Sequence, residues 1–481
     1  MVPSYLYLVL LVMIPLIVGF GSFFIPNARS CRQFSAIFLW VQLALVAFLL
    51  RSLLSGDVTV MNFYLGFSAD RISAFFIVLV TFMMACATTH ADYFFATEEA
   101  QNIGMPGRSH RKFYAATNLF LVAMTYVFIC DSLGYLWISV EATTLTSAYL
   151  VYYDKTKNSL EATWKYLMIC TVAIGFALLG TVFIFASSQN GAIPGGSLYI
   201  SDLIAHADQL NFPLLKLGFM FCLIGYGTKA GVFPLYSWMP DAYSEAPAPA
   251  SAMLAGALIN VSLFAIWRVK QIIAASAMHS LIEQTVTIMG VITIIAGSLL
   301  LIRQQSFKRM WAYSSIENTG LMLVAIGMNF GGLFLLHAIN HSFAKVTLFL
   351  VSGDIIHASG TKKLGHLQGV LKACPLWGVL LALATFALTG CPPFGSFLSE
   401  MTLLLAMADA GRFALVAILV IAIGVSFVAI CVHVGRILFG GPKAKFSAYK
   451  PVRASVIPAI LICCSLAMGT LVNSNFWINL K

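Results

Sequence analysis

Long runs of apolar residues, separated by short polar breaks, follow one another along almost the whole chain. Because about 20 consecutive apolar residues are needed to cross a bilayer as a helix, each run predicts one membrane-spanning segment. The pattern therefore predicts an all-α polytopic membrane protein with about 14 transmembrane helices. The predicted segments are residues 4–25, 34–54, 72–94, 113–130, 134–153, 164–186, 213–239, 250–268, 284–303, 308–327, 330–352, 374–408, 412–437 and 454–474.

The composition supports the pattern, because 60% of the residues are hydrophobic and only 10% are charged. Soluble domains carry about 25% charged residues, so a water-soluble globular protein is excluded, and the apolar content excludes a disordered chain. The ten cysteines show no CxxC pair and no metal-ligand spacing. We therefore expect no metal and no cofactor on this chain. The first segment is long enough to be a span, so no cleavable signal peptide is expected.

Basic residues are concentrated in the loops that follow the odd-numbered segments. By the positive-inside rule these loops face the cytoplasm, so both termini are predicted to lie outside. The net charge of +10 comes from these loop residues, which act as orientation signals in the membrane. The charge is therefore not a sign of nucleic-acid binding, and no nucleic-acid partner is expected. The residues concerned are Arg29, Arg32, Arg108, Arg111, Lys112, Lys155, Lys157, Arg303, Lys308, Arg309, Lys362, Lys363, Lys372, Lys443, Lys445, Lys450 and Arg453.

Two predicted segments are too long for one crossing and contain internal prolines. Pro234 lies in the seventh segment, and Pro392 and Pro393 lie in the twelfth. Proline removes a backbone donor and clashes with the preceding turn, so we expect both helices to be broken within the membrane. Broken helices occur there when they are buried in protein or line a wet cavity.

Two short stretches indicate an internal duplication. The sequence SVEATTL at 139–145 and the sequence SIENTGL at 315–321 each carry a glutamate in the same local frame. Two units of five segments, the second inverted because five is odd, would each contain one acidic helix and one broken helix. The predicted organisation is three N-terminal helices in 1–112, a first five-helix repeat in 113–270, an inverted second repeat in 284–440 and a C-terminal helix in 441–481.

Several ionisable residues lie inside predicted segments, although each costs about 2.5–3.5 kcal/mol at the centre of a membrane helix. His337, His341 and Lys345 recur at every fourth position and therefore share one helix face. Carboxylates, lysines and imidazoles can change charge when they are buried near one another, which indicates a path for protons. The candidates for proton translocation are Glu141, Lys229, Glu317, His337, His341, Lys345 and Glu400.

An alternative role for these charges is to hold helices together by ion pairs. A single buried pair would suit either role, but a row across five segments fits the proton path better. Accessory candidates are Lys165, Asp241 and His433. Lys165 could instead extend to the membrane surface, and Asp241 follows a helix break, where a loop or helix-cap role fits better. The chain has no Walker loop, HExxH motif or nucleophile elbow, so no catalytic residue is expected.

The stretch GTKAGVFPLYSWMPDAYSEAPAP at 227–249 resembles the signature of the proton-translocating subunits of respiratory complex I and the Mrp antiporters. Within that superfamily, four further stretches look like the F component of hydrogenase-4-type (group 4 membrane-bound hydrogenase) complexes. They are VEATTL at 140–145, SLEATWKY at 159–166, YSSIEN at 313–318 and HAINHSFAK at 337–345. The resemblance extends from about residue 60 to residue 440.

The resemblance implies fourteen core helices in two inverted five-helix repeats. It implies that Glu141 and Lys229 form the pair of the first half-channel, and that His337, His341 and Lys345 form the central relay, with Glu400 as the last ionisable residue. It also implies the inner (cytoplasmic) membrane of a prokaryote, as a non-catalytic subunit of a complex of the NADH:quinone oxidoreductase or hydrogenase type. Other membrane-arm subunits and a peripheral redox arm would be the partners, and nickel–iron and iron–sulfur centres would belong to those partners.

The chain departs from the family at two points. Many members carry a lysine or histidine in the eighth segment where this chain has Asn260. Because an amide does not titrate near neutral pH, the link to the central relay would run through water or another residue. The chain also ends soon after its last segment, which favours a subunit without the long lateral helix of the distal complex I subunit.

The expected function is translocation of an ion, the proton, in a hydrogenase-4-like or complex-I-like redox complex. One alternative is a subunit of a cation/proton antiporter of the Mrp type, which needs no redox partner. Another is a membrane adaptor that couples a different soluble protein to the proton gradient. A free-standing channel is disfavoured, because the charged row offers alternating sites instead of an open pore.

Overall fold

The computed structural model describes the chain except for residues 1–3, 26, 55–59, 63–65, 101–108, 190–192, 277–278, 442–445, 447–450, 473 and 479–481. Helices account for most of the described part. Two short strands, β1 (Val60–Asn62) and β2 (Phe67–Ala69), pair antiparallel between the second and third helices. The architecture is therefore that of a helical bundle.

The helices follow one another along the chain with short connections. A π-helix, η2 (Leu254–Leu258), joins two of them without a break. The α-helices are α1 (Ser4–Gly21), α2 (Ala28–Leu54), α3 (Arg71–Ala100), α4 (His110–Ile129), α5 (Leu133–Val151), α6 (Lys157–Gln189), α7 (Ile200–Ala205), α8 (Phe212–Ala230), α9 (Trp238–Glu245), α10 (Ala248–Met253), α11 (Ile259–Ala274), α12 (His279–Leu301), α13 (Phe307–Gly327), α14 (Gly331–Ser359), α15 (Val370–Ala373), α16 (Pro375–Leu388), α17 (Gly395–Asp409), α18 (Phe413–Leu438), α19 (Pro451–Leu471) and α20 (Ser474–Ile478). Two short 3-10 turns are η1 (Ala207–Gln209) and η3 (Leu364–His366).

Each predicted segment overlaps at least one of these helices. The seventh and twelfth segments are each two helices, α8 with α9 and α16 with α17. The apolar pattern did not predict the π-helix, which lies inside the continuous helical run Ala248–Ala274. Among the described residues, nine helices are by themselves long and apolar enough to cross a membrane. These helices support the predicted all-α membrane class.

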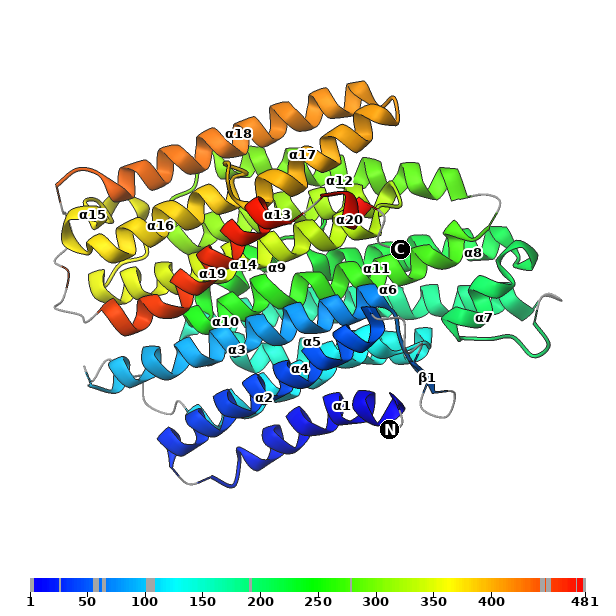
Figure 1. Cartoon of the computed structure of the whole chain (residues 1–481), viewed down its shortest axis with the longest axis horizontal. Helices are drawn as coiled ribbons and strands as arrows, with labels where there is room; N and C mark the ends of the chain where they lie inside the picture. The colour runs from blue at the N-terminus through cyan, green and yellow to red at the C-terminus, as the bar shows by residue number, and fades with distance from the viewer. Residues whose placement is uncertain are drawn as a thin grey trace.

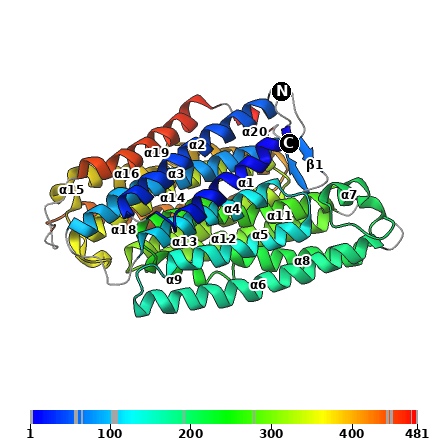
Figure 2. The ribbon, with the colours of Figure 1, turned by 90° about the horizontal axis from the view of Figure 1, so that it is seen from below.

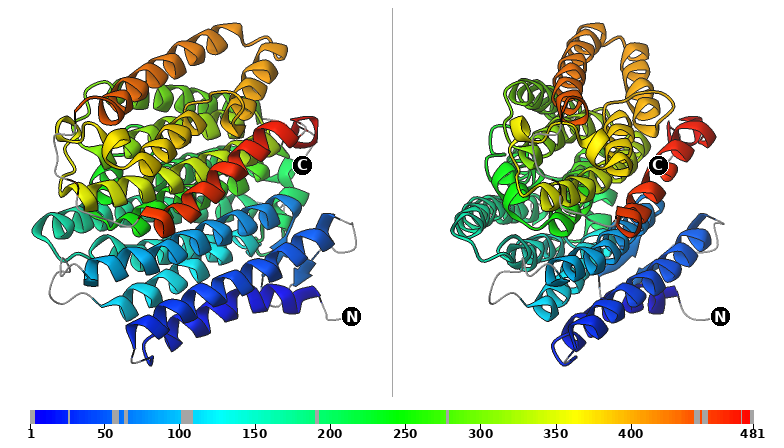
Figure 3. Two further views of the ribbon diagram at one scale, coloured as in Figure 1. Left: turned by 60° about the vertical axis from the view of Figure 1, so that its left-hand side comes forward. Right: turned by 90° about the vertical axis from the view of Figure 1, so that its left-hand side faces the viewer.

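The long helices lie roughly side by side, with α1 and α2 along one edge of the bundle and α18 along the opposite edge (Figure 1). Seen from below, α6 and α8 run together along a third edge (Figure 2). Helix α14 lies at the centre, because it packs against α3, α10, α13, α16, α17 and α19. Helix α19 passes obliquely along one side of the bundle (Figure 3).

Burial separates the central helices from the peripheral ones. The spans that contain α11 and α14 are buried along nearly their whole length, whereas most residues of α2 and α18 are partly or fully exposed. The exposed side chains are large and apolar, for example Leu145, Met168 and Ile421. An apolar outer surface around a polar-containing core is what a bilayer requires. The central helices are therefore the ones able to carry ionisable side chains away from lipid.

Glycines allow two helix pairs to approach closely, α6 with α8 and α12 with α13. A Cβ atom added at Gly180 would lie 2.6 Å from the carbonyl oxygen of Gly218 and 2.8 Å from the amide nitrogen of Cys222. At Gly290 an added Cβ would lie 2.9 Å from the carbonyl oxygen of Gly320. Such distances are impossible for a real side chain, so small residues set the spacing of both pairs.

We expect Gly180→Val to lower the free energy of unfolding by about 1–3 kcal/mol, because the added carbons must force α6 away from α8. The measurement is thermal unfolding of the purified protein in a mild detergent. Gly175→Val is the matched control on the same helix, since an added Cβ there meets nothing within 4 Å. Equal stability of the two variants would show that the close approach is not needed.

Candidate functional site

The first part of the candidate site joins α5 to α8. Lys229 is fully buried in the last turn of α8. Its ammonium group donates hydrogen bonds to the carbonyl oxygen of Val140 and to the hydroxyl oxygen of Thr144, both on α5. The Thr144 hydroxyl lies 3.4 Å from a carboxylate oxygen of Glu141 and donates to it. The pair expected between Glu141 and Lys229 is therefore bridged by a threonine hydroxyl.

Glu141 faces the periphery of the bundle. Its second carboxylate oxygen accepts a hydrogen bond from the hydroxyl of Thr171 on α6, at 3.2 Å. Glu141 is half-buried, and Thr171 is exposed. One end of this part of the site is thus at the outer surface of the subunit, and the other end, at Lys229, is in the interior.

The first helix break lies directly after Lys229. Helix α8 ends at Ala230, Gly231 has a left-handed φ of 83°, and α9 begins at Trp238. Pro234 lies between the two helices. The freed backbone groups find partners, because the Trp238 indole donates to the carbonyl of Thr228 at 2.9 Å and the Phe233 amide donates to the hydroxyl of Thr293 at 3.2 Å. These two hydrogen bonds satisfy backbone groups at the edges of the break, whereas Phe233, Pro234 and Leu235 within it are exposed.

The centre of the site lies on α14, where His337, His341 and Lys345 are all buried. The Lys345 ammonium donates to the carbonyl oxygen of Trp311 at 2.7 Å and to the hydroxyl of Ser314, both on α13. Like Lys229, Lys345 is held by a carbonyl and a hydroxyl of a neighbouring helix. In the part of the chain that the structure describes, no carboxylate lies within ion-pair distance of either ammonium group.

Hydrogen bonds connect the His337 ring to α13 through one nitrogen and to α17 through the other. Its Nε2 lies 3.1 Å from the Asn318 side-chain oxygen, and the Asn318 amide nitrogen donates to Glu317 at 2.7 Å. Its Nδ1 lies 2.9 Å from the hydroxyl of Ser399, the residue before Glu400. His337 therefore links α13 to α17 through polar groups.

Several buried polar atoms around the centre have no hydrogen-bond partner among the described residues. They include both ring nitrogens of His341, the side-chain oxygens of Asn260 and Asn340, and the hydroxyl of Ser396. A buried polar atom without a partner costs about 1–3 kcal/mol. In native proteins such groups are usually satisfied by ordered water, so this region suits a hydrated path.

Glu317 and Glu400 line one small cavity at the far end of the row. Both carboxylates are nearly buried, and the cavity has room for about one water molecule. Thr389 and Ser426 supply hydroxyl groups to its wall. Helix α16 ends at Leu388 and α17 begins at Gly395, so Pro392 and Pro393 lie in the second break, beside this cavity.

The accessory candidates divide into two groups. Asn260, fully buried, donates to the Gly256 carbonyl at 3.0 Å and to the Ser342 hydroxyl at 2.8 Å, so it touches α14 between His341 and Lys345. The other candidates, Lys165, Asp241 and His433, lie elsewhere.

Lys165 and Asp241 belong to a network of ion pairs at the surface. Lys165 is half-exposed and pairs with Glu161 at 2.7 Å and with Asp241 at 3.2 Å, and Asp241 also pairs with Arg309. His433 on α18 lies 3.2 Å from the carbonyl oxygen of Leu301 at the end of α12. These three residues are therefore not brought together with the buried row.

Two buried features, the lysine Lys308 and the pair His90–Asp354, are not among the candidate residues predicted from the sequence. Lys308 was counted among the loop charges, yet its side chain is only 6% exposed, and its ammonium donates to the Ala246 carbonyl at 2.6 Å. His90 and Asp354 form a fully buried pair between α3 and α14, 3.1 Å apart. The signal for His90 was present, because it is an ionisable residue inside the third predicted segment. Lys308 is the first residue of the tenth predicted segment, and a position at a segment end gives no sign of burial.

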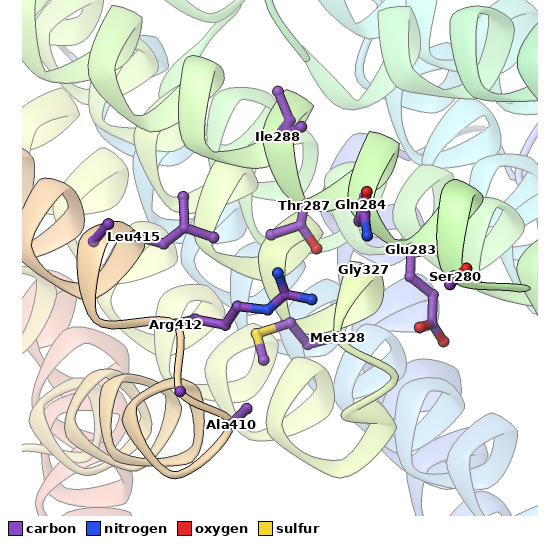
Figure 4. Close-up of a pocket in the computed structure, with 12 residues that line it drawn as sticks. Ser280, Glu283, Gln284, Thr287, Ile288, Gly327, Met328, Ala410, Arg412 and Leu415 are labelled. Atoms are coloured by element: carbon purple, nitrogen blue, oxygen red, sulfur yellow. The ribbon is translucent and has the colours of Figure 1, made fainter.

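A separate pocket of about 630 Å³ opens between α12, the turn before α14 and the turn before α18. Figure 4 shows the Arg412 side chain extending toward Thr287 and Met328, with Glu283 farther along the same wall. Within the described ranges, no group of three or more His, Cys, Asp or Glu residues is placed to hold a metal ion.

Known membrane proteins resemble this chain in sequence and in its helical-bundle fold. The family model described as "NADH:quinone oxidoreductase/Mrp antiporter, TM" matches residues 130–426. The "Hydrogenase-4 component F homolog" of Methylacidiphilum infernorum (isolate V4) is 34% identical over 400 residues, which are 82% of this chain and 82% of that protein.

Two solved structures share the fold. A chain of the archaeal membrane-bound sulfane sulfur reductase superposes with a TM-score of 0.85 at 23% identity, covering 98% of this chain and 95% of the other. A chain of the Mrp complex from Dietzia sp. DQ12-45-1b gives 0.84 at 19% identity, covering 100% and 96%. The resemblance seen in the sequence is thus confirmed, and the chain belongs to the membrane-subunit family shared by NADH:quinone oxidoreductases and Mrp antiporters.

Proposed function

We propose that this chain translocates protons as a membrane subunit of a hydrogenase-4-like or complex-I-like redox complex. The observation that carries the proposal is the buried polar row from Glu141 through Lys229 and Lys345 to Glu400. The row begins at the half-buried Glu141 and continues through the interior of a bundle whose outer faces are apolar. Charged groups at membrane depth are expensive, so a row of them is best explained by function.

The first step of the proposed path runs between Glu141 and Lys229. The Thr144 hydroxyl accepts from the lysine and donates to the carboxylate. A hydroxyl that does both can pass a proton by exchanging one for the other. A change of charge at the outer surface near Glu141 would alter how strongly Lys229 holds its proton. Glu141 is therefore the proposed point at which a neighbouring subunit acts on the row.

The middle of the path connects Lys229 to Lys345. Asn260 does not titrate, but its amide contacts Ser342 on α14. The unpartnered nitrogens of His341 and the unpartnered oxygen of Asn260 are suited to hold water between the two lysines. We infer that water, ordered by these atoms, replaces the titratable residue that many relatives carry at this position.

The last part of the path leads from Lys345 to the cavity shared by Glu317 and Glu400. Asn318 and His337 connect the two carboxylate-bearing helices by hydrogen bonds of 2.7–3.1 Å. Two carboxyl groups that share one cavity favour a state in which one of them holds a proton. Arrival of a second proton would then release the first toward the surface.

We propose fourteen crossings for the chain, with both termini outside. Helices α8 with α9 and α16 with α17 would each make one interrupted crossing. The two interruptions, each beside an ionisable residue, support a first repeat in 113–270 and an inverted repeat in 284–440, between the N-terminal helices of 1–112 and the C-terminal helix of 441–481. The lysine-rich loops would lie on the cytoplasmic side.

The proposed partners are other membrane subunits and a peripheral redox arm that carries the nickel–iron and iron–sulfur centres. The 34% identity to a hydrogenase-4 component F homolog extends over 82% of both chains, whereas the 31% identity to a Na(+)/H(+) antiporter subunit A1 extends over 63% of this chain and 39% of that one. This difference in coverage favours a redox complex over an antiporter. The test is affinity purification from the native host in a mild detergent, with mass spectrometry of the co-purifying proteins. Recovery of a metal-bearing arm supports the proposal. Recovery of small antiporter subunits alone, or of an unrelated soluble protein, contradicts it.

We expect Thr144→Val to slow proton translocation about 10- to 100-fold, because it removes the hydroxyl that hydrogen bonds to both charged groups. The measurement is substrate-driven proton uptake by inverted membrane vesicles of the host. Thr146→Val is the matched control, since that hydroxyl bonds only to carbonyls of its own helix. If Thr144→Val transported protons at the wild-type rate, Thr144 would not be part of the path.

A further inference from the structure

A second large pocket, independent of the buried row, lies beside the loop around η3 and the last turns of α18. Its volume is about 1000 Å³. Five segments that are distant in sequence enclose it: the start of α6, the end of α9, the connection from α12 into α13, the loop around η3 and the last turns of α18. The His433 ring lies within 3.2–3.3 Å of two carbonyl oxygens at the end of α12 and so ties α18 to α12 at the pocket.

The pocket is strongly basic. Five lysines and arginines line it, and Glu245 is the one acidic residue among the described residues of its wall. Arg309 is paired with Asp241, and Lys362 is paired with Glu245. The other three cations have no carboxylate within ion-pair distance in the described part of the chain, and they are Arg303, Lys363 and Arg436. The pocket therefore has three cations available for an anionic ligand.

Apolar surface begins at the rim of the pocket. Ile302, next to Arg303, is 49% exposed, and Val432 and Phe439 near Arg436 are 45% and 65% exposed. From there, exposed apolar side chains continue along the two helices, including Leu299 on α12 and Val428 on α18. A ligand that pairs with the three cations and also covers the apolar surface of α12 and α18 has an anionic headgroup and long apolar tails.

We propose that this pocket binds the phosphate headgroup of an anionic phospholipid, whose acyl chains lie along α12 and α18. Guanidinium groups suit phosphate oxygens because they donate paired hydrogen bonds. Basic pockets between membrane helices on the cytoplasmic side are typical sites for such headgroups. The lipid would fix the α12–α18 contact beside the cavity of Glu317 and Glu400, but its binding does not depend on whether protons move.

The test compares two triple variants of the whole protein, purified with its partners in mild detergent and stripped of lipid. The pocket variant is Arg303→Gln with Lys363→Gln and Arg436→Gln. The control is Arg29→Gln with Arg111→Gln and Lys112→Gln, which removes the same charge from exposed residues on the same predicted side of the membrane. Binding of phosphatidylglycerol, cardiolipin, phosphatidylcholine and inorganic phosphate is measured by native mass spectrometry and by thermal stabilisation.

We expect the wild type and the control to bind the two anionic lipids, and the pocket variant to bind them about 100-fold more weakly. Phosphatidylcholine should bind to none of the three. Equal weakening in both triple variants would overturn the proposal, because it would show general attraction to a basic face. Binding of inorganic phosphate as tight as that of lipid would assign the pocket to a free anion. Loss of an acidic partner protein, with unchanged lipid binding, would assign it to a protein contact.

Discussion

Lys229→Met is expected to reduce proton translocation at least about 100-fold while the subunit still assembles. The ammonium of Lys229 is the one titratable group between Glu141 and the central helix in the described part of the row, and it is bonded to the Val140 carbonyl and the Thr144 hydroxyl. Methionine keeps the length and volume of the side chain but cannot carry a proton. Burial of an apolar side chain at this site should not disturb packing.

The measurement is substrate-driven proton uptake by inverted membrane vesicles of a strain that carries the variant on its chromosome. The amount of the subunit in the membrane, measured by immunoblot, reports assembly. Lys165→Met is the matched control, because that lysine is half-exposed and belongs to a surface ion-pair network. Full proton uptake in Lys229→Met would refute the role of Lys229.

Lys345→Met is expected to cause a loss of the same size. Lys345 is fully buried at the centre of α14 and lies between the two halves of the row. Groups that act in series are not additive, since a path blocked once is already closed. The double variant Lys229→Met with Lys345→Met should therefore transport no more slowly than either single variant.

The same vesicle measurement applies, with Lys372→Met as the control for an exposed lysine in α15, outside the row and the basic pocket. If the double variant were clearly slower than both single variants, the two lysines would belong to separate paths. That result would leave two half-sites in the subunit without the proposed connection between them.

The helices were predictable because burial in a membrane leaves a strong apolar pattern. The observed ends at Ala230 and Leu388 each lie four residues before a proline, Pro234 or Pro392. That spacing is the one at which the proline ring clashes with a helix carbonyl. Local sequence was therefore enough to place these interruptions.

The partners of the buried charges were not predictable, because they depend on contacts between distant helices. The Thr144 bridge forms because the Lys229 side chain reaches from α8 to α5, and Lys308 reaches the Ala246 carbonyl before α10 and the Ser251 hydroxyl on α10. The π-helix at Leu254–Leu258 has no apolar signature that differs from an α-helix. The sequence places His90 inside a predicted segment, but its pairing with Asp354 and the burial of Lys308 depend on how distant helices pack together.

The most direct test of the central claim uses the purified complex, with its co-purified partners, in sealed proteoliposomes. Once the partner arm is identified, its electron donor is supplied from outside, and the internal pH is followed with a trapped dye. We predict a pH change that develops without sodium, disappears with a protonophore and is absent in Lys229→Met and Lys345→Met. Electron transfer at the wild-type rate without any pH change, or with one that requires sodium, would contradict the account.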